Sequence, residues 1–462
     1  MYIEQMYTNC LAAAAYYIES NGEAAVIDPL RETDPYIEKA KSRGAKIKYV
    51  FETHFHADFV SGHIDLARKT GATIVYGPEA ATEYSVYNAK DGEEFKLGAI
   101  TFKVLHTPGH TLESSCYLLS DENGKPHSIF TGDTLFVGDV GRPDLLDGYM
   151  TKEELANMMY DSLNNKIKVL ADDVIMYPAH GPGSACGKSM GKETYSTIGI
   201  QKKTNYALQP MSREDFILKV TEGLSAPPAY FFKDAAINKK GYDAIDDVMQ
   251  RNTSLLSVAE FEKAMDYAIV LDTRIADEFE KGFIPGSLNI GLDGMFAVWV
   301  GSLVDIHKPI LVVTTPGKEE ESILRLARVG YEHVEGVLSG GIESWINAGK
   351  TIDKVKSIHA DEVKNYYNKP GYKILDARKP GEYETSHIDG AINIELNQIE
   401  NRMGELDSDC TYIMHCAAGY RSMIASSILK KNGKSNFINV TGGYNALQNT
   451  DLPKEASVIE VV

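Results

Sequence analysis

Cysteine is scarce in this chain of 462 residues, which contains only five. An odd number of cysteines scattered through a long chain does not make a disulfide framework, so we expect a reducing, cytoplasmic setting. Positive charge is also in short supply, because 47 lysines and arginines face 65 aspartates and glutamates, a formal net charge of -18. This balance argues against a nucleic acid or an anionic membrane surface as the partner.

Long apolar runs are absent as well, since no run approaches the roughly 18 residues that span a bilayer. The first residues lack the basic start and apolar core of a signal peptide. Hydrophobic residues make up 43% and charged residues 24% of the chain, as in globular proteins. The length exceeds what a single core supports and predicts about two to four domains.

Histidine is unevenly distributed. Seven of the 12 histidines lie in the first 180 residues, so imidazole chemistry is expected in the first half of the chain. These seven are His54, His56, His63, His106, His110, His127 and His180.

The segment from Thr53 to His63 combines two histidines and a carboxylate. An apolar, β-branched run over residues 47–51 predicts a buried strand just before it, and residues 64–69 have a helical pattern. His54, His56 and Asp58 therefore lie on a loop at the end of a strand, where side chains can converge on one ion. Two histidines and an aspartate within five residues favour a metal site over a structural role.

The same arrangement recurs three more times in the first half. Strands are predicted over residues 100–105, 128–130 and 174–177, and they lead to His110, Asp133 and His180. Glycine just before His110 and Asp133 permits tight turns that direct these side chains inward. Four such loops in this order form a specific constellation.

This constellation resembles the metallo-β-lactamase superfamily, which implies an αββα sandwich with a metal cleft at one sheet edge. The resemblance covers about the first half of the chain and departs from the usual motif at one position. Members with two metals have histidine directly after the aspartate, whereas this chain has Phe59. Phenylalanine cannot bind a metal, which argues against a complete second-metal site and a zinc-pair hydrolase.

Within the superfamily, the sequence most resembles the persulfide dioxygenases. This resemblance implies one Fe(II) per chain, bound by His54, His110 and Asp133. Two imidazoles and one carboxylate form the facial triad of non-haem iron oxygenases, whereas zinc is redox-inert. The remaining polar residues of the constellation become groups around the ligands, or alternative ligands: His56, Asp58 and His180.

Two further residues near the constellation have more than one interpretation. Arg142 follows the Asp133 loop and can bind the carboxylate or phosphate of a thiol carrier, or pair internally with Asp144. Cys186 follows His180 and is either a thiol near the cleft or a buried, inert one.

The second half contains an internal repeat. Leu-Asp-Thr-Arg at 271–274 matches Leu-Asp-Ala-Arg at 375–378, and residues 283–290 match residues 387–394 at the same offset. Each repeat of about 100 residues alternates strands and helices, which predicts two small parallel α/β domains. We expect a metallo-β-lactamase-like domain over residues 1–240, an inactive rhodanese-like domain over 241–352 and a catalytic rhodanese domain over 353–462.

The two repeats differ in one loop. In the second repeat a short strand leads into Cys416, Ala417, Ala418, Gly419, Tyr420 and Arg421, and a helix follows. A cysteine between a strand and a helix N-terminus faces backbone N–H groups that favour a thiolate and bind anions. This loop resembles the rhodanese active-site loop, in which Cys416 would be catalytic and Arg421 would add a fixed positive charge. In the first repeat Thr314 and Glu319 replace them, so that repeat resembles an inactive rhodanese domain.

Both halves converge on sulfane sulfur, and the whole chain resembles bacterial persulfide dioxygenase–rhodanese fusions. The resemblance implies a small-molecule persulfide and dioxygen as substrates, with sulfite and thiosulfate as products. The thiol carrier, the direction of sulfur transfer at Cys416 and the oligomeric state stay open, and a homo-oligomer is compatible with the sequence. The alternatives are a mononuclear zinc thioester hydrolase of the glyoxalase II type, fused to a sulfurtransferase, and a non-enzymatic sulfur-relay or persulfide-sensing protein.

Overall fold

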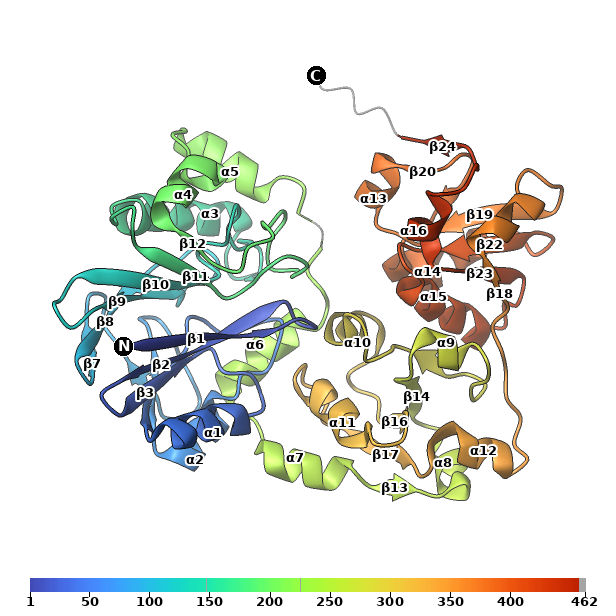
Figure 1. Cartoon of the computed structure of the whole chain (residues 1–462), viewed down its shortest axis with the longest axis horizontal. Coiled ribbons are helices and arrows are strands. Elements are labelled where there is room, and N and C mark those ends of the chain that lie inside the picture. Colours follow the sequence, from blue (N-terminus) through green and yellow to red (C-terminus); the bar gives the residue numbers. More distant parts are fainter. Residues whose placement is uncertain (147, 225, 457–462) are drawn as a thin grey trace. The chain divides into compact units, whose positions relative to one another are not determined.

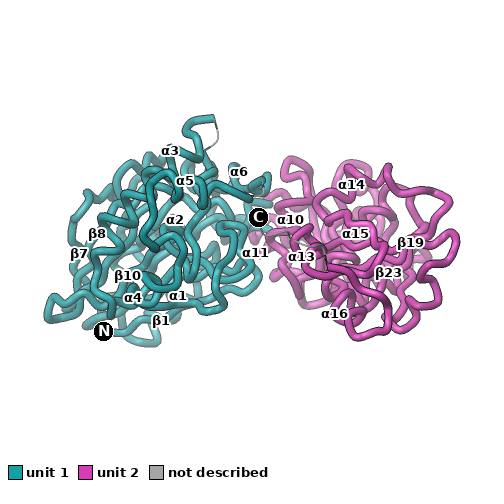
Figure 2. The backbone as a smooth tube through the Cα atoms, turned by 90° about the horizontal axis from the view of Figure 1, so that it is seen from above, with its two compact units in different colours: residues 1–248, 326–331 teal, residues 249–325, 332–462 magenta. Residues whose placement is uncertain are grey.

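The structure is a computed structural model that describes residues 1–146, 148–224 and 226–456 (Figure 1). The chain divides into two compact units (Figure 2). The first comprises Met1–Val248 and Leu326–Tyr331, and the second comprises Met249–Arg325 and Glu332–Val462. The domain boundaries expected at residues 240 and 352 stay predictions. None of the helices in the described part of the chain combines the length and apolar character needed to cross a membrane.

The first unit contains two six-stranded sheets. The strand order of one is β1-β2-β3-β4-β5-β6, and that of the other is β12-β11-β10-β9-β8-β7. The strands are β1 (Tyr2–Thr8), β2 (Ala13–Ser20), β3 (Glu23–Ile27), β4 (Lys46–Phe51), β5 (Thr73–Tyr76), β6 (Tyr87–Asn88), β7 (Glu94–Leu97), β8 (Ile100–His106), β9 (Ser115–Ser120), β10 (Pro126–Gly132), β11 (Ile175–Pro178) and β12 (Ser196–Thr197). The helices are α1 (Asp34–Arg43), α2 (His63–Thr70), α3 (Lys152–Ser162), α4 (Ile198–Thr204), α5 (Arg213–Thr221), α6 (Phe231–Lys240) and α7 (Ile245–Asn252).

The alternation of side chains along β2 shows how the layers are built. Tyr16 and Ile18 point to the other sheet, where they pack with Phe102 and Phe130. Their neighbour Tyr17 points the opposite way and packs with Tyr36 of α1. Successive residues of a strand face opposite sides of a sheet, so both faces of this strand are buried.

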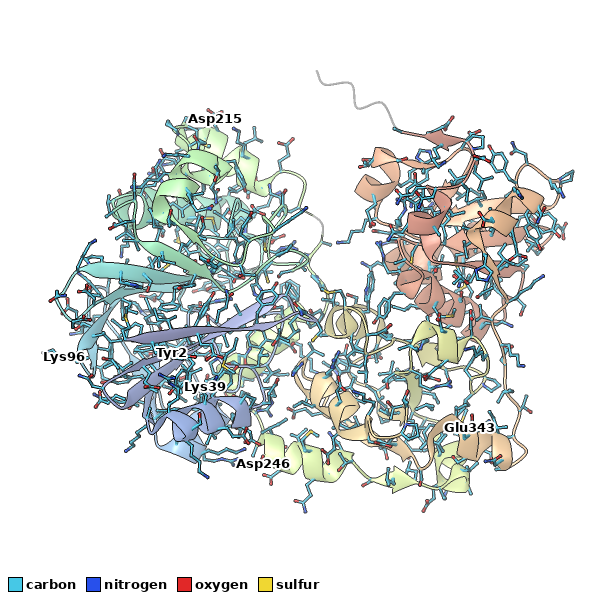
Figure 3. The ribbon with its side chains drawn as sticks, in the orientation of Figure 1. Tyr2, Lys39, Lys96, Asp215, Asp246 and Glu343 are labelled. Atoms are coloured by element: carbon cyan, nitrogen blue, oxygen red, sulfur yellow. The ribbon has the colours of Figure 1, made fainter. Side chains whose placement is uncertain are left out.

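The second sheet is covered on its outer face in the same way. Met159 of α3 and Phe216 of α5 pack against Leu118 of β9 and Ile129 of β10. The first unit is therefore an αββα sandwich, as predicted. Charged side chains such as Lys96 and Asp215 lie on its exposed surface (Figure 3).

The second unit contains two five-stranded sheets with parallel pairing between their neighbouring strands. The first has the order β13-β17-β16-β14-β15 and the second the order β18-β23-β22-β19-β21. A two-stranded antiparallel sheet of β20 and β24 joins the second repeat. The predicted pair of small parallel α/β repeats is thereby confirmed.

The elements of the first repeat are β13 (Leu255–Leu256), α8 (Val258–Ala264), β14 (Ile269–Asp272), α9 (Ala276–Phe279), β15 (Leu288–Asn289), α10 (Phe296–Leu303), β16 (Ile310–Val313), α11 (Glu319–Ala327), β17 (Val334–Leu338) and α12 (Gly341–Asn347). Those of the second are β18 (Ser357–His359), β19 (Tyr372–Asp376), α13 (Pro380–Thr385), β20 (His387–Ile388), β21 (Ile392–Asn393), α14 (Ile399–Arg402), β22 (Thr411–His415), α15 (Tyr420–Lys431), β23 (Phe437–Thr441), α16 (Gly443–Leu447) and β24 (Lys454–Glu455).

Candidate functional sites

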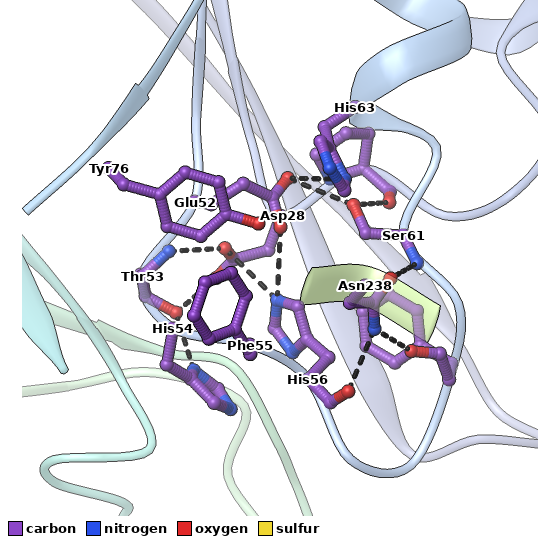
Figure 4. Close-up of polar contacts among 12 residues, drawn as sticks. Asp28, Glu52, Thr53, His54, Phe55, His56, Ser61, His63, Tyr76 and Asn238 are labelled. Carbon is purple, nitrogen blue, oxygen red and sulfur yellow. Dashed lines mark hydrogen bonds and ion pairs between the residues drawn. The ribbon is translucent and has the colours of Figure 1, made fainter. Parts of the chain in front are cut away.

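The loop between β4 and α2 carries the first cluster of polar side chains. His54, His56 and Asp58 are all at least 95% buried. Asn238 of α6 holds this loop by its backbone, because its Nδ2 donates to the carbonyls of His56 and Phe59, each at 2.8 Å (Figure 4). Its Oδ1 accepts a third bond, from the backbone N–H of Ser61, at 2.9 Å. The loop is thus fixed by a side chain that is distant in sequence.

Three of the four predicted loops bring His54, His110 and Asp133 together. The Nε2 atom of His110 lies 3.3 Å from Oδ2 of Asp133, and that of His54 lies 3.8 Å from the same oxygen. Both Nε2 atoms and both carboxylate oxygens are buried without a hydrogen-bond partner among the described residues. Buried polar atoms are costly unless something satisfies them, so this converging set of two nitrogens and one carboxylate fits a metal ion.

The outer nitrogens of the two histidines have partners that orient the rings. Nδ1 of His110 lies 2.8 Å from the carbonyl of Arg142, to which it can donate. Nδ1 of His54 lies 2.9 Å from the hydroxyl of Thr53, which itself donates to Asp28 at 2.8 Å. These bonds place the hydrogen on Nδ1 and leave the Nε2 lone pair facing the centre, as in metal-binding histidines.

Electrostatics agrees with this protonation state. Burial, together with the neighbouring histidines His56 and His110, holds the pKa of His54 well below its usual value. A neutral imidazole is the form that binds a metal. For His180, burial acts in the opposite direction to the carboxylates of Asp58 and Asp133, and the carboxylates raise its pKa.

A second group of three side chains lies beside the first. His56, Asp58 and His180 each offer one ligand atom, and these atoms lie within 4.8 Å of one another. Nε2 of His180 lies 3.4 Å from Asp58 and 3.5 Å from Asp133, so Asp133 adjoins both groups. Phe59 stacks on the ring of His56, with centroids 4.3 Å apart. The structure therefore gathers the predicted surrounding groups into an alternative ligand set.

Beneath His56 lies a buried acidic pair that no motif in the sequence indicates. Nε2 of His56 lies 3.2 Å from Asp28 and 3.8 Å from Glu52 (Figure 4). Burial and the proximity of Asp28 raise the pKa of Glu52 well above its usual value. Asp28 also accepts the backbone N–H of Thr53 at 2.8 Å, so it supports the His54 loop from below.

Cys186 and Arg142 lie close to these groups. The sulfur of Cys186, a buried thiol, lies within 4.8 Å of ligand atoms of Asp133 and His180. Arg142 is 96% buried, and its guanidinium forms a bidentate pair with Asp144 at 2.6 and 2.7 Å. The internal pair is thus formed, and its backbone carbonyl orients His110; a role for its side chain in substrate binding stays a prediction.

A cavity of about 530 Å³ opens beside the histidine loops. Phe55 and Ala57 from the His54 loop and Thr111, next to His110, form one part of its wall. Apolar side chains dominate the rest, including Leu145 and Phe231. A cavity of this size and character accommodates a small organic molecule.

The second site lies in the second repeat, where β22 ends at His415. Cys416 is buried, and the backbone N–H of Gly419 donates to its sulfur at 3.2 Å. Gly419 has a φ of +107°, a conformation that glycine adopts without strain. Helix α15 begins at the next residue, so the sulfur faces a helix N-terminus as predicted from the sequence.

Arg421 lies in the first turn of α15. Its guanidinium forms a bidentate ion pair with Glu382 of α13, at 2.6 and 2.7 Å. The sequence motif predicts a fixed positive charge at this position but does not reveal the carboxylate that fixes it. The only local signal for Glu382 is its place in the first turn of a helix.

The register of the sheets aligns the two repeats. Asp272 pairs with Val313 in the first repeat as Asp376 pairs with His415 in the second. Thr314 therefore stands where the second repeat has Cys416. Its hydroxyl is satisfied by hydroxyl groups of Thr273 at 2.8 Å and Ser322 at 3.1 Å. The first repeat keeps the framework of the loop and lacks its thiol.

Comparison with known proteins agrees with this architecture. The profile of the Metallo-beta-lactamase superfamily matches residues 8–180, and that of the Rhodanese-like domain matches residues 257–348 and 359–450. A solved metallo-beta-lactamase structure from Staphylococcus aureus subsp. aureus COL is 31% identical and has a TM-score of 0.65. That match covers 73% of this chain and 98% of the other. The chain belongs to the metallo-beta-lactamase superfamily and carries two rhodanese-like domains.

Two further similarities cover smaller parts. The probable hydroxyacylglutathione hydrolase glo2 of Schizosaccharomyces pombe (strain 972 / ATCC 24843) is 35% identical over 160 residues, which is 34% of this chain. This chain spans 58% of the length of that hydrolase. The crystal structure of ETHE1 from Myxococcus xanthus is 29% identical, with a TM-score of 0.45, and the match covers 52% of this chain and 98% of the other.

Proposed function

We propose that this chain oxidises a low-molecular-weight persulfide with dioxygen to sulfite and transfers sulfane sulfur through Cys416, giving thiosulfate. One observation carries the proposal. A buried set of two imidazoles and one carboxylate occurs in the same chain as a cysteine on a rhodanese-type loop. Two imidazoles and one carboxylate are the donor set of non-haem iron oxygenases. The backbone N–H groups of a rhodanese-type loop suit a persulfide anion on the cysteine.

His54, His110 and Asp133 would hold one Fe(II). When bound, this ion supplies the redox chemistry and the open coordination positions for the sulfur and dioxygen. The protein's own contribution is to keep the two Nε2 atoms unprotonated, through the bonds from Nδ1 to Thr53 and to the carbonyl of Arg142. The cavity beside the loop would bind the body of the persulfide through its apolar wall and exclude water.

At the second site, the Cys416 thiolate attacks the sulfane sulfur of a persulfide. A new S–S bond forms, the old one breaks, and the carrier thiolate leaves with the electron pair. Sulfite then attacks the outer sulfur of the Cys416 persulfide, which releases thiosulfate and restores the thiolate. The N–H of Gly419 and the charge of Arg421 would stabilise the anionic sulfur. We also propose a reducing cytoplasm as the setting, because it keeps the Cys416 thiol reduced and free to react.

The two activities can be separated by one substitution. Cys416→Ser should abolish thiosulfate formation and leave persulfide-dependent oxygen uptake largely intact, with sulfite accumulating. The matched control is Cys410→Ser, which removes another thiol of the same repeat from a partly exposed position. If oxygen uptake stops in Cys416→Ser but not in the control, the assignment of the two reactions to two sites is wrong.

A second candidate function is hydrolysis of a glutathione thioester. The similarity to a hydroxyacylglutathione hydrolase favours it, and the His56, Asp58 and His180 group offers ligands for a further metal. Phe59, stacked on His56, argues against it because it occupies a position where two-metal members have histidine. Hydrolysis of a hydroxyacylglutathione thioester by zinc-loaded protein, without oxygen consumption, would favour this candidate.

A further inference from the structure

Helix α15 of the second repeat is buried on all sides. Every residue from Ser422 to Leu429 is buried, although several are polar or small. A helix that packs on one sheet alone exposes its outer face, so other elements must cover this one, and α14 of the same repeat is one of them. Strand β15 of the first repeat lies against it, and Ser427 accepts the backbone N–H of Asn289 at 3.0 Å.

The first residue of this helix also contacts the first repeat. The hydroxyl of Tyr420 donates to the carbonyl of Gly291 at 2.7 Å. Its ring lies against Gly294, where an added Cβ would meet ring atoms at 2.5 Å. Gly291 and Gly294 belong to the segment that follows β15, so one loop of the first repeat provides both the hydrogen bond and the surface for the ring.

Tyr420 is directly bonded to the residue that binds the catalytic sulfur. Gly419 precedes it and donates its backbone N–H to the sulfur of Cys416. Gly419 has a left-handed φ, and its carbonyl accepts a hydrogen bond from the Ser422 hydroxyl at 3.1 Å. Fixing Tyr420 at both its ring and its hydroxyl anchors the chain directly after Gly419 and so restricts where the N–H that meets the sulfur can point.

The aligned position in the first repeat has a different residue. Lys318 stands where the second repeat has Tyr420; it is exposed, and its amine pairs with Glu321 of the next turn at 2.7 Å. The fold of the repeat thus forms without an aromatic residue at this position. The contact of Tyr420 is specific to the loop that carries the cysteine.

We propose that the first rhodanese-like repeat, although it lacks the thiol, positions the Cys416 loop through Tyr420, which makes Tyr420 a positioning residue for sulfur transfer. This inference rests on the sulfurtransferase activity proposed above. It assigns a task to the repeat that has neither a cysteine nor an arginine in its own loop.

The test uses the full-length chain with thiosulfate and cyanide. In this assay Cys416 takes the outer sulfur of thiosulfate and releases sulfite, and cyanide then removes that sulfur as thiocyanate. Tyr420→Phe keeps the ring and removes the hydrogen bond, and Gly294→Ala displaces the ring. The matched control is Lys430→Gln, which breaks another contact of α15, the ion pair with Asp353 at 3.0 Å, near the far end of the helix from the cysteine.

We expect Tyr420→Phe to lower kcat about fivefold with little change in KM for thiosulfate, the effect of about one hydrogen bond. Alkylation of Cys416 by iodoacetamide, followed by peptide mass spectrometry, should slow by a similar factor. Lys430→Gln should match the wild type in both measurements, and Gly294→Ala, if it folds, should lose more than Tyr420→Phe.

The inference would be overturned if Tyr420→Phe had the same kcat and alkylation rate as the wild type. It would also be overturned if Lys430→Gln lost as much of both as Tyr420→Phe. The alkylation rate decides the question even if the wild type transfers no sulfur. In that case the proposed sulfurtransferase activity fails on its own, and the positioning of the thiol is still measured.

Discussion

Arg421 and Glu382 are joined by two hydrogen bonds of 2.6 and 2.7 Å, and the guanidinium also interacts electrostatically with Cys416. A partly buried bidentate pair holds the guanidinium in one orientation. Arg421→Met removes the charge, and we expect sulfur transfer to fall tenfold or more. Glu382→Gln keeps the charge and one acceptor, so its loss should be smaller. Equal activity of Arg421→Met and the wild type in the thiosulfate and cyanide assay would contradict a role for this charge.

Phe59 offers a test of the metal stoichiometry. It stacks on His56 beside the group of His56, Asp58 and His180. Phe59→His adds a further nitrogen there, and we expect zinc-loaded protein to approach two metal ions per chain, measured by plasma emission spectrometry. Phe59→Leu is the control for the lost stacking and should keep the wild-type ratio. An unchanged number of metal ions per chain in Phe59→His would show that metal binding by His56, Asp58 and His180 is not limited by the lack of a histidine at position 59.

Asn238 makes three hydrogen bonds to the backbone of the His54 loop. Asn238→Ala leaves two carbonyls and one N–H of the buried loop without this partner, at a cost of about 1–3 kcal/mol each if they stay unsatisfied. We expect a lower melting temperature and faster loss of metal to a chelator. Asn436→Ala removes an asparagine that also donates to two carbonyls, but near the surface of the second repeat. Equal metal loss in both variants would exclude a role for Asn238 in the site.

The thiols should differ in reactivity. Burial raises the pKa of Cys116 to about 11, so at pH 8 only about one thiol in a thousand is ionised. Burial and the carboxylates of Asp58 and Asp133 likewise raise the pKa of Cys186 well above its usual value. Iodoacetamide at pH 8 should therefore label Cys10 and Cys410, which are partly exposed, and spare Cys116 and Cys186. Rapid labelling of Cys116 in folded protein would contradict its burial.

The fold could be predicted from the sequence because strands and helices leave periodic patterns of apolar residues. The strand expected over residues 47–51 is β4, one residue longer, and the loops bearing His110, Asp133 and His180 follow β8, β10 and β11. The repeat of Leu-Asp-x-Arg also predicted two equivalent sheets, and their registers agree. These features depend on alternating burial and strand ends, which single sequences record.

The side-chain contacts that fix the His54 loop and the Cys416 loop leave no periodic pattern in the sequence. Asn238 bonds a carbonyl 182 residues away, and Tyr420 bonds one 129 residues away. A side chain that donates to a distant backbone carbonyl requires neither a fixed spacing nor a particular partner residue. Glu382 and Asp28 were missed for the same reason, since each resembles an ordinary acidic residue until the fold places it beside its partner.

Metal content and oxygen uptake, measured together, test whether the chain holds an iron centre that consumes oxygen. Protein prepared anaerobically is analysed for metals, and oxygen uptake is then followed with glutathione persulfide or coenzyme A persulfide. We expect about one iron per chain and persulfide-dependent oxygen uptake, with both lost in His110→Ala and kept in the control His127→Ala. Zinc in place of iron, with no oxygen uptake, would rule out the dioxygenase and leave Cys416 as an independent sulfurtransferase site.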